Sequence, residues 1–539
     1  MLFSEPVFLF AFLPIVLCGF LLIARFRRPQ WVMLWLIAAS FFFYGWWRVD
    51  FVPLLAISTL VNYVIGLALG RWPQRWLLIL GISLNLAALG WFKYAGFFAE
   101  AINDLAGLGV PVPQIVLPLA ISFYTFQQIA FLVDAQAGAA REISLLRYTL
   151  FVSFFPQLIA GPIVHHREIL QQFLNPKTFT PQTDNLILGL TAFSIGLFKK
   201  VVIADPLAPI AALAFGPAAD GITPGAIEAW LGAVAFSLQM YFDFSGYSDM
   251  AIGLGLMFGI RLPVNFFSPY KSCSIIEFWS RWHMTLTRFL TAYIYNPIVM
   301  SLTRRRVAAG KPLLRRSKPA FEPFVVLVAV PTFITFFLSG IWHGAGWQFI
   351  AFGLLHAFYM IINHGWRALR QHWRFDLGPA WLGRIAGVGL TFLAVTLALV
   401  FFKANSLEHA YTVVRGMIGL GDYTQMMPTI GGRDAAEMSI LEYVLWRLAS
   451  PQGALIAVSL GIVWLLPNTI QYLEIIPKAA ARLASLADTT RSLLPSLRWQ
   501  TVLAARGGLV EGGIIGALLA IALLRAASVA PSEFLYFTF

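Results

Sequence analysis

The chain has 539 residues, of which 59% are hydrophobic and only 12% are charged, and its formal net charge is +13. Apolar runs of roughly 18 to 22 residues recur along it, and each is long enough to cross a hydrocarbon layer of about 30 Å. This composition excludes an ordinary soluble domain. It also argues against nucleic acid as a partner, because the Lys and Arg side chains lie in short loops between apolar runs. We therefore expect an all-α, polytopic membrane protein that forms one multi-span domain over residues 1–539.

The first apolar run predicts a retained membrane helix rather than a cleaved leader. No basic residue precedes this run, whereas Arg25, Arg27 and Arg28 follow it, which is the reverse of a signal peptide and predicts an N-terminus outside the membrane. The N-terminal group of spans covers residues 7–97 and the C-terminal group covers residues 383–530. Further apolar runs, interpreted as spans, are Trp31–Trp47, Phe51–Gly70, Trp76–Phe97, Val116–Val133, Leu186–Ala204, Ile385–Phe402, Ala454–Leu466 and Gly513–Ala530.

One apolar run, Leu150–Val164, is interrupted by Pro156 and by the pair Gly161-Pro162. Proline removes backbone hydrogen bonds that lipid cannot replace, so this run predicts a broken or re-entrant helix buried against protein, with a Pro-kinked span as the alternative. His165-His166-Arg167 follows directly and is interpreted as an interfacial cluster. No metal site is expected there, because the sequence offers no acidic or thiol partner at ligand spacing.

The segment Ala226–Ile260 carries polar side chains deep in an apolar context, in the stretch YFDFSGYSD. In a helix Tyr241 and Ser245 share a face, while Asp243 points elsewhere. Buried hydroxyls and a carboxylate need partners or water, which favours a polar cavity over lipid contact. For Asp243 a structural role, holding a backbone amide or an arginine, stays open beside a chemical one.

Residues Ser274–Pro297 predict an amphipathic helix that is too charged to cross bare lipid. Ser274 and Glu277 have the spacing of a capping box, and Glu277 and Arg281 form an i,i+4 pair. The helix would carry His283, for which interfacial packing is the alternative to a functional role. The next stretch, Thr303–Pro319, has seven basic residues and no acidic one, and it predicts a cytoplasmic loop against anionic lipid headgroups or an acidic acyl donor.

The stretch Pro331–His356 places one imidazole, His343, between two strongly apolar runs with Gly340 and Gly344 beside it. An ionisable side chain at membrane depth is a candidate functional residue by default. The alternative is a histidine that is hydrogen-bonded inside a helix bundle.

These segments together carry a resemblance to a known family. The motifs are LPLAISFYTFQQIAFLVD (117–134), FFPQLIAGPI (154–163), YFDFSGYSDMAIGLGLMFGI (241–260), EFWSRWHMTL (277–286) and SGIWHGA (339–345). In this order they resemble the membrane-bound O-acyltransferase superfamily, in the bacterial alginate O-acetyltransferase branch that includes cellulose-acetylating proteins. The resemblance implies a ring of tilted helices around a central tunnel, with re-entrant and interfacial helices and a core at approximately residues 110–365.

The resemblance also implies roles for individual residues. His343 matches the catalytic histidine of the family, and His283 matches the second histidine of this branch. Acyl transfer from a thioester needs a base for the attacking hydroxyl and a donor for the oxyanion, so His343 is assigned as base or acyl relay and His283 as the polarising or orienting partner. The residues assigned to the substrate tunnel are Asp243, Tyr241, Ser245, Trp342, Trp282, Arg281 and Gln157. No metal and no tightly bound cofactor are expected.

The implied function is transfer of an acetyl group from a cytoplasmic thioester, either acetyl-CoA or an acyl carrier protein, toward an exported polysaccharide. The resemblance implies that the protein lies in the bacterial inner membrane. Membrane lipids, periplasmic acetyltransferases of the SGNH type and polysaccharide-export proteins are the expected partners. D-alanyl transfer to teichoic acid, a proton-coupled transporter and a catalytically inactive export scaffold are the alternatives. The chain departs from its relatives at Leu290–Tyr293, where they commonly carry an Arg-Asp pair, and this leaves the docking surface for the donor or partner open.

Overall fold

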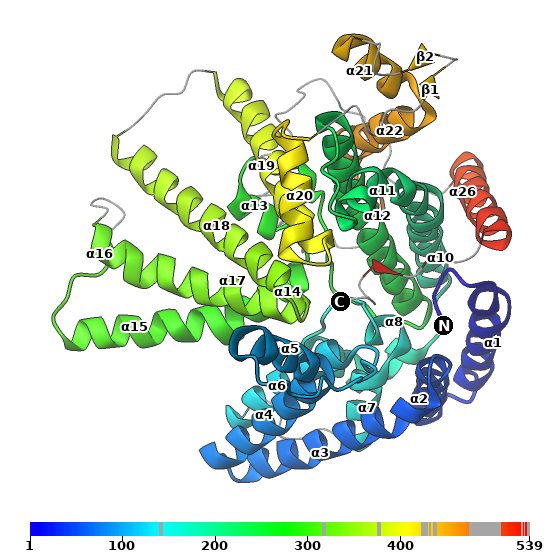
Figure 1. Cartoon of the computed structure of the whole chain (residues 1–539). Helices are drawn as coiled ribbons and strands as arrows, with labels where there is room; N and C mark the ends of the chain where they lie inside the picture. Colours follow the sequence, from blue (N-terminus) through cyan, green and yellow to red (C-terminus); the bar gives the residue numbers. More distant parts are fainter. Residues whose placement is uncertain are drawn as a thin grey trace. The chain divides into compact units, whose positions relative to one another are not determined.

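The structure is a computed structural model of the chain. It describes residues 1–138, 144–314, 320–373, 379–421, 429–430, 433–434, 439–473, 508–529, 532 and 534–535. Nearly all regular structure within these ranges is helical (Figure 1), which confirms the all-α prediction. The strands within them are β1 (Thr429–Ile430) and β2 (Arg433–Asp434), which form one short antiparallel pair.

The chain divides into two compact units. The first comprises Met1–Phe198, Phe244–Val264 and Gly508–Phe539, and the second comprises Lys199–Asp243 and Asn265–Gly507. The α-helices of the first unit are α1 (Leu13–Ala24), α2 (Pro29–Gly45), α3 (Val52–Arg71), α4 (Arg75–Leu89), α5 (Ala95–Ala106), α6 (Ile121–Gln136), α7 (Leu145–Ser153), α8 (Phe155–Leu158), α9 (His166–Leu174), α10 (Thr183–Phe198) and α26 (Leu509–Ser528). The expectation of a single domain over the whole chain stays a prediction.

The second unit holds both candidate catalytic histidines. Its α-helices are α11 (Asp205–Ala219), α13 (Ile275–Trp279), α14 (Met284–Leu290), α15 (Asn296–Ala308), α16 (Phe321–Phe324), α17 (Val330–His343), α18 (Trp347–Trp373), α19 (Ala380–Lys403), α20 (Leu407–Met417), α21 (Ile440–Ala449), α22 (Pro451–Leu465) and α23 (Thr469–Leu473). Helix α12 (Ala226–Met257) contributes residues to both units. Shorter π-helical turns lie at Phe8–Phe12, Gly90–Tyr94, Lys199–Ala204, Thr291–Tyr295 and Val325–Ala329, and 3₁₀ turns lie at Val49–Phe51, Pro176–Phe179 and Pro269–Lys271.

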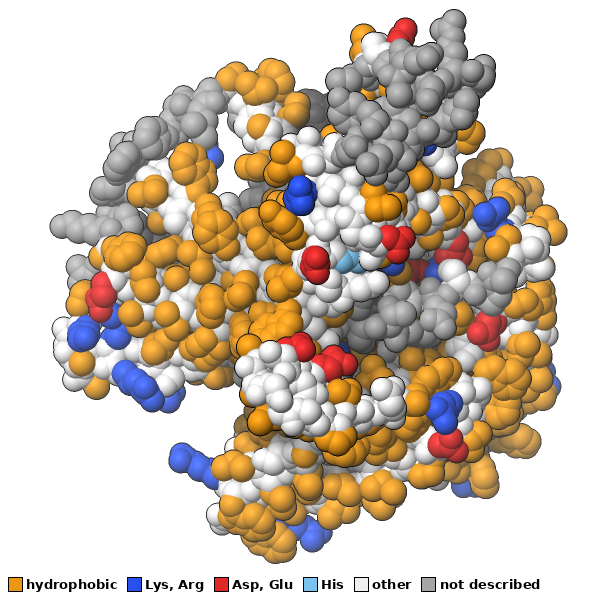
Figure 2. Space-filling view, in the orientation of Figure 1, with side chains coloured by type: hydrophobic (Ala, Val, Ile, Leu, Met, Phe, Trp, Pro, Cys, Tyr) orange, Lys and Arg blue, Asp and Glu red, His pale blue; other side chains and the backbone are white. Residues whose placement is uncertain are grey.

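Seven helical segments of the described chain are long and apolar enough to cross a membrane. They are Val49–Arg71, Arg75–Ala106, Thr183–Ala219, Phe321–His343, Trp347–Arg370, Trp381–Lys403 and Leu509–Ser528. The number rises to eight when Leu441–Ala449 and Pro451–Leu465, which meet at 72°, are taken as one bent span. Figure 2 shows hydrophobic side chains over much of the visible surface, with Lys and Arg side chains at only a few places. The protein is therefore a multi-pass membrane protein.

The interrupted apolar run is a broken helix, as predicted. Helix α7 ends at Ser153, α8 is a single turn, and the chain is then non-helical until α9. The side-chain amide of Gln157 donates to the carbonyl of Phe151, so it satisfies a backbone acceptor near the end of α7 that lipid could not satisfy. Phe154, Phe155 and Leu158 are buried, which agrees with the prediction that protein covers this segment.

Several predicted elements differ from the structure. Phe8–Ala24 and Pro29–Gly45, where spans were predicted, are apolar helices of 10–17 residues and are not among the seven candidate spans. The first residues of the predicted loop Thr303–Pro319 belong to α15. Helix α6 begins at Ile121 instead of Val116, because Ala120 adopts a left-handed conformation (φ 64°) that interrupts helical backbone just before it. The predicted continuous helix over Ser274–Pro297 is wrong: α13 ends at Trp279, and His283 adopts a left-handed conformation (φ 42°, ψ 51°) before α14 starts. Helical periodicity continues across this break in the sequence, so the pattern alone does not reveal it.

Helices α17 and α18 pack closely where Gly340 meets Gly353. A Cβ atom on Gly353 would lie 2.4 Å from the carbonyl oxygen of Phe336 and 2.9 Å from the Cα of Gly340. Backbone therefore faces backbone at this crossing, as small residues allow in membrane helix pairs. Because His343 ends α17, the crossing sets the position of its side chain.

We expect Gly353→Ala to destabilise the protein, because the added methyl group meets rigid backbone on α17. Overpacking of this kind costs about 1–3 kcal/mol. Thermal unfolding of the detergent-solubilised protein measures the effect. Gly365→Ala on the same helix is the matched control, since a Cβ there meets only a Phe324 ring atom at 3.7 Å. Equal melting temperatures for the two variants would contradict the close crossing.

Candidate active site

His343 is the last residue of α17, and its side chain is buried among aromatic rings. Its ring centroid lies 4.9 Å from that of Trp342, 5.5 Å from that of Phe352 on α18 and 5.3 Å from that of Phe402 on α19. The helix ends here because Gly344 is extended, and a Cβ on Gly344 would lie 2.1 Å from the ring of Phe349. Three elements of the second unit thus surround the buried imidazole with aromatic rings.

His283 sits in the break between α13 and α14, and its side chain is fully buried. The Oδ1 atom of Asn265 lies 3.1 Å from Nδ1 of His283 and 2.9 Å from the hydroxyl of Thr285. The backbone N–H of Thr285 also donates to this Oδ1 atom, at 3.3 Å. A backbone amide can only donate, so the Asn265 atom is an oxygen, and Nδ1 of His283 must carry the proton that it donates.

This hydrogen bond determines which nitrogen of the His283 ring carries the proton. The proton on Nδ1 leaves Nε2 of the neutral ring with a lone pair, so Nε2 acts as an acceptor. Burial lowers the pKa of His283 to about 3, so the ring stays neutral at physiological pH.

Trp342 links the two histidines. Its ring centroid lies 6.1 Å from that of His283 and 4.9 Å from that of His343. The structure therefore brings both predicted catalytic residues to one indole, although they are 60 positions apart in the sequence. Two predicted tunnel residues lie next to them: Trp282 precedes His283, and the ring centroid of Tyr241 lies 6.4 Å from that of Trp282.

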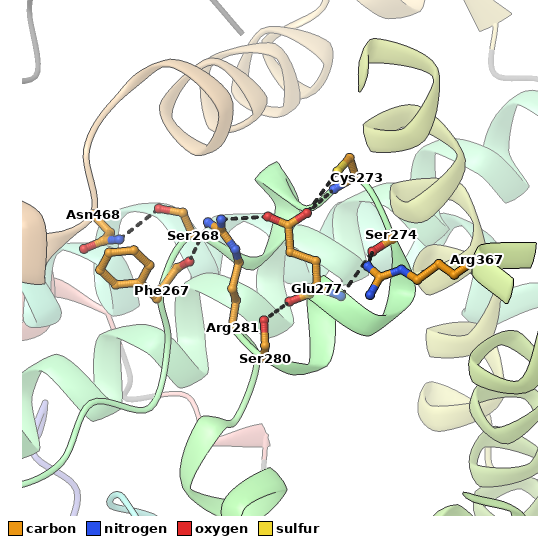
Figure 3. A network of polar contacts seen from close by, with 9 residues as sticks. All are labelled: Phe267, Ser268, Cys273, Ser274, Glu277, Ser280, Arg281, Arg367 and Asn468. Carbon is orange, nitrogen blue, oxygen red and sulfur yellow. Dashed lines mark hydrogen bonds and ion pairs between the residues drawn. The ribbon is translucent and has the colours of Figure 1, made fainter. Parts of the chain in front are cut away.

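Arg281 is an anchor for the loop that precedes His283. Its Nη2 donates to Oε1 of Glu277 at 2.7 Å, which confirms the predicted i,i+4 pair, and its side chain is only 1% exposed. Figure 3 shows the Glu277 carboxylate between Arg281 and Cys273. The other carboxylate oxygen of Glu277 accepts from the amide and the thiol of Cys273, each at 3.0 Å.

The predicted capping box is therefore only half present. The hydroxyl of Ser274 accepts from the amide of Glu277 at 3.2 Å, but the Glu277 carboxylate binds the amide of Cys273 rather than that of Ser274. The guanidinium of Arg367, on α18, donates to the same hydroxyl of Ser274 at 3.0 Å.

Asp243 forms an ion pair with a lysine, which the sequence did not suggest. The Nζ atom of Lys200 lies 2.7 Å from Oδ1 of Asp243 and 2.9 Å from Oδ1 of Asp205. Asp243 and Lys200 are almost fully buried, with side-chain exposures of 1% and 7%. The contact places Asp243 in a buried ion cluster with Lys200 and Asp205. The other two predicted tunnel residues, Ser245 and Gln157, belong to the first unit.

Sequence reasoning missed three contributors to this region. Asn265 precedes His283 by 18 residues, and a lone amide in the apolar stretch RLPVNFFSPY was the available signal. Lys200 lies 43 residues before Asp243 and directly follows Lys199. In the sequence the two lysines look like the ordinary charged end of a membrane span. The indole N–H of Trp279 donates to Nδ1 of His356 at 3.2 Å, and so connects α13 to α18.

Comparison with known proteins identifies the family. Residues 134–309 match the MBOAT, membrane-bound O-acyltransferase family. The chain is 40% identical over 453 residues to the peptidoglycan O-acetyltransferase of Helicobacter pylori, an alignment that covers 78% of this chain and 80% of that protein. It is 41% identical over 436 residues to the probable alginate O-acetylase AlgI of Azotobacter vinelandii, with 79% of each chain covered. The teichoic acid D-alanyltransferase of Bacillus subtilis is 25% identical over 300 residues, which cover 56% of this chain and 72% of that one. The chain therefore belongs to the membrane-bound O-acyltransferase family, in its AlgI-like branch, and is a multi-pass O-acyltransferase.

Proposed function

We propose that the protein passes an acetyl group from a cytoplasmic thioester across the bacterial inner membrane for O-acetylation of a polysaccharide outside. The observation that carries the proposal is that two buried histidines, His283 and His343, both contact the indole of Trp342. The names of the relatives at about 40% identity, a peptidoglycan O-acetyltransferase and alginate O-acetylases, support acetyl over D-alanyl as the group transferred.

In the proposed reaction His343 acts as the base. Its imidazole accepts the proton of the attacking hydroxyl, the hydroxyl oxygen forms a bond to the thioester carbonyl carbon, and the carbon–sulfur bond breaks. The proton then passes from His343 to the leaving thiolate. The products are an acetate ester and a free thiol, so atoms and charges balance. Acetyl-CoA and an acyl carrier protein both supply such a thioester.

The hydrogen bond at Nδ1 distinguishes between the two roles expected for His283, polarising and orienting. Because Nε2 of the neutral ring carries no proton, it is unsuited to polarising the carbonyl as a donor. It is suited to accepting a hydrogen bond from a hydroxyl of the acceptor that does not react. We therefore assign His283 the orienting role and Asn265 the role of holding His283 in that tautomer.

The experiment that tests the function compares a strain lacking the protein with the same strain complemented by the wild type. Base-releasable acetate is measured on the exported polysaccharide and on peptidoglycan, and ester-linked alanine is measured on the cell wall. Restored acetate on either polymer supports the proposal and identifies the acceptor. Restored alanine alone would indicate D-alanyl transfer, and no change in either ester would favour a transporter or an export scaffold. Periplasmic SGNH-type acetyltransferases and export proteins are the partners proposed for the outer steps.

We expect His283→Asn to remain folded while acetate incorporation falls about tenfold or more, the effect of losing one hydrogen bond of about 1.4 kcal/mol. Asparagine tolerates the left-handed conformation of residue 283, whereas alanine there is strained by about 1–2 kcal/mol. His283→Ala should therefore be the less stable of the two, with acetate incorporation reduced at least as much. Acetate release and thermal unfolding of both variants check this. Wild-type acetylation by His283→Asn would leave His283 a purely structural residue.

Asn265→Asp is expected to make acetylation depend on pH. A carboxylate beside Nδ1 stabilises the imidazolium, so the pKa of His283 rises from its depressed value of about 3. Protonation removes the acceptor at Nε2. Activity should therefore be lost at acidic pH and recover as pH increases through the raised pKa, and a pH profile of acetyl transfer in membranes measures this. A profile parallel to that of the wild type would contradict the proposed role of Asn265.

A further inference from the structure

A second cluster of chemically active side chains lies in the first unit. Asp134 is in the last turn of α6, His165 precedes α9, and His166 opens that helix. One potential ligand atom from each residue lies within 4.8 Å of the other two. The sequence offers no acidic residue near these histidines at ligand spacing. In the structure, however, the carboxylate of Asp134, 31 residues before His165, lies next to both.

The distances within this Asp134 cluster suit a common ion. Oδ2 of Asp134 lies 2.8 Å from Nε2 of His165 and 3.4 Å from Nδ1 of His166. Ligand atoms around a tetrahedral zinc ion with bonds of about 2.0–2.1 Å are about 3.3 Å apart. The three side chains are therefore already near the separation that a shared ion would impose. Asp134 and His165 are 16% and 27% exposed, which leaves a path from solvent.

His166 supplies an independent sign of a missing ligand. Its side chain is 98% buried, and neither Nδ1 nor Nε2 makes a hydrogen bond within the described structure. The ring packs edge-on against Phe131 with centroids 5.9 Å apart, so it is held in place rather than directed to solvent. A buried imidazole ordinarily satisfies at least one nitrogen. Coordination of an ion together with Asp134 would satisfy it.

We propose that Asp134, His165 and His166 bind one divalent transition-metal ion of the zinc class. Two imidazoles and one carboxylate suit zinc and its first-row neighbours better than magnesium or calcium, which prefer oxygen ligands. Water would take the remaining position. The ion would tie the end of α6 to the start of α9, the helix that follows the broken segment, so its role would be structural.

Binding would change one existing contact. Nδ1 of His165 now accepts from the backbone N–H of Arg167 at 3.3 Å, which is a long hydrogen bond. If His165 coordinates an ion through Nε2, the proton of its neutral ring lies on Nδ1. Nδ1 can then no longer accept from the Arg167 N–H, so this hydrogen bond would be lost. Without an ion, the cluster is held by a hydrogen bond between Nε2 of His165 and Oδ2 of Asp134.

The test uses the full chain, purified in detergent with an affinity tag that contains no histidine. After treatment with a chelator and removal of the chelator, the protein is dialysed against micromolar zinc, and metal per chain is measured by mass spectrometry. We expect about one zinc ion per wild-type chain. Thermal unfolding should shift upward with zinc and return with chelator. For His166→Ala and for Asp134→Asn we expect affinity to fall by at least about tenfold.

Controls keep the result specific. His364→Ala removes a histidine from α18 in the second unit and should leave zinc stoichiometry unchanged. Asp134→Asn nearly preserves the shape of the side chain, so a monodisperse Asp134→Asn protein without zinc separates loss of the ligand from misfolding. Less than about 0.2 zinc per wild-type chain, or equal zinc in the wild type and both cluster variants, would overturn the proposal and leave a hydrogen-bonded pair.

Discussion

His343→Ala is expected to abolish acetate incorporation, with a loss of at least about 10²-fold, because no other group in the proposed reaction accepts the hydroxyl proton. The imidazole is enclosed by Trp342, Phe352 and Phe402, so alanine also leaves a cavity. His343→Gln fills more of that volume while lacking a base of suitable pKa, and it should be equally inactive. Base-releasable acetate on the polymer is measured in cells that carry each variant, with membrane abundance determined in parallel.

His364→Ala serves as the matched control for this experiment. It makes the same chemical change on α18, at a half-buried position outside the proposed reaction, and acetylation should be unaffected. Full acetylation by an abundant His343→Gln protein would refute catalysis by His343. The scaffold and transporter hypotheses would then be favoured.

The second large effect is expected at the ion cluster. Lys200→Met removes the ammonium group that lies between Asp205 and Asp243 and leaves two carboxylates in a poorly solvated site. Breaking a buried ion pair in this way costs about 3–5 kcal/mol. We expect a much lower melting temperature and lower membrane abundance. The triple variant Lys200→Met/Asp205→Asn/Asp243→Asn carries none of these charges and should recover most of the lost stability.

Lys199→Met provides the comparison within the same π-helical turn. Nζ of Lys199 donates to the hydroxyl of Thr469 at 2.9 Å. A hydrogen bond to a charged group contributes about 1.5–3 kcal/mol, so this variant should lose less stability than Lys200→Met. If Lys200→Met is as stable as Lys199→Met, or if the triple variant is no better than Lys200→Met, the cluster does not carry the expected electrostatic coupling.

The sequence predicted those features that depend on local pattern. Apolar length predicted five of the seven candidate spans in the described chain, Pro156 predicted the broken helix, and the isolation of His343 in an apolar run marked it as a candidate. Features that depend on contacts across the sequence were not predictable in this way. The partner of Asp243 is 43 residues away, and the partner of His165 is 31 residues away, and neither spacing corresponds to a helical period.

The break at His283 illustrates a different limit. The apolar periodicity of Phe278, Trp282 and Phe289 suits a continuous helix, yet residue 283 turns into the left-handed region. The turn is stabilised by the three donors that converge on Asn265, and these become visible only when both segments are in place. A functional side chain thus occupies a position where local preference is overruled.

The aromatic enclosure of His343 also bears on the energetics of the cell. In the proposed transfer the proton taken from the hydroxyl returns to the departing thiolate, so one turnover neither takes up nor releases a proton. Trp342, Phe352 and Phe402 pack around the imidazole, which would limit exchange of that proton with bulk water during the step. Acetylation would then proceed without dissipating the transmembrane proton gradient, driven by the thioester alone, and collapse of the gradient by an ionophore would leave the transfer step itself unchanged.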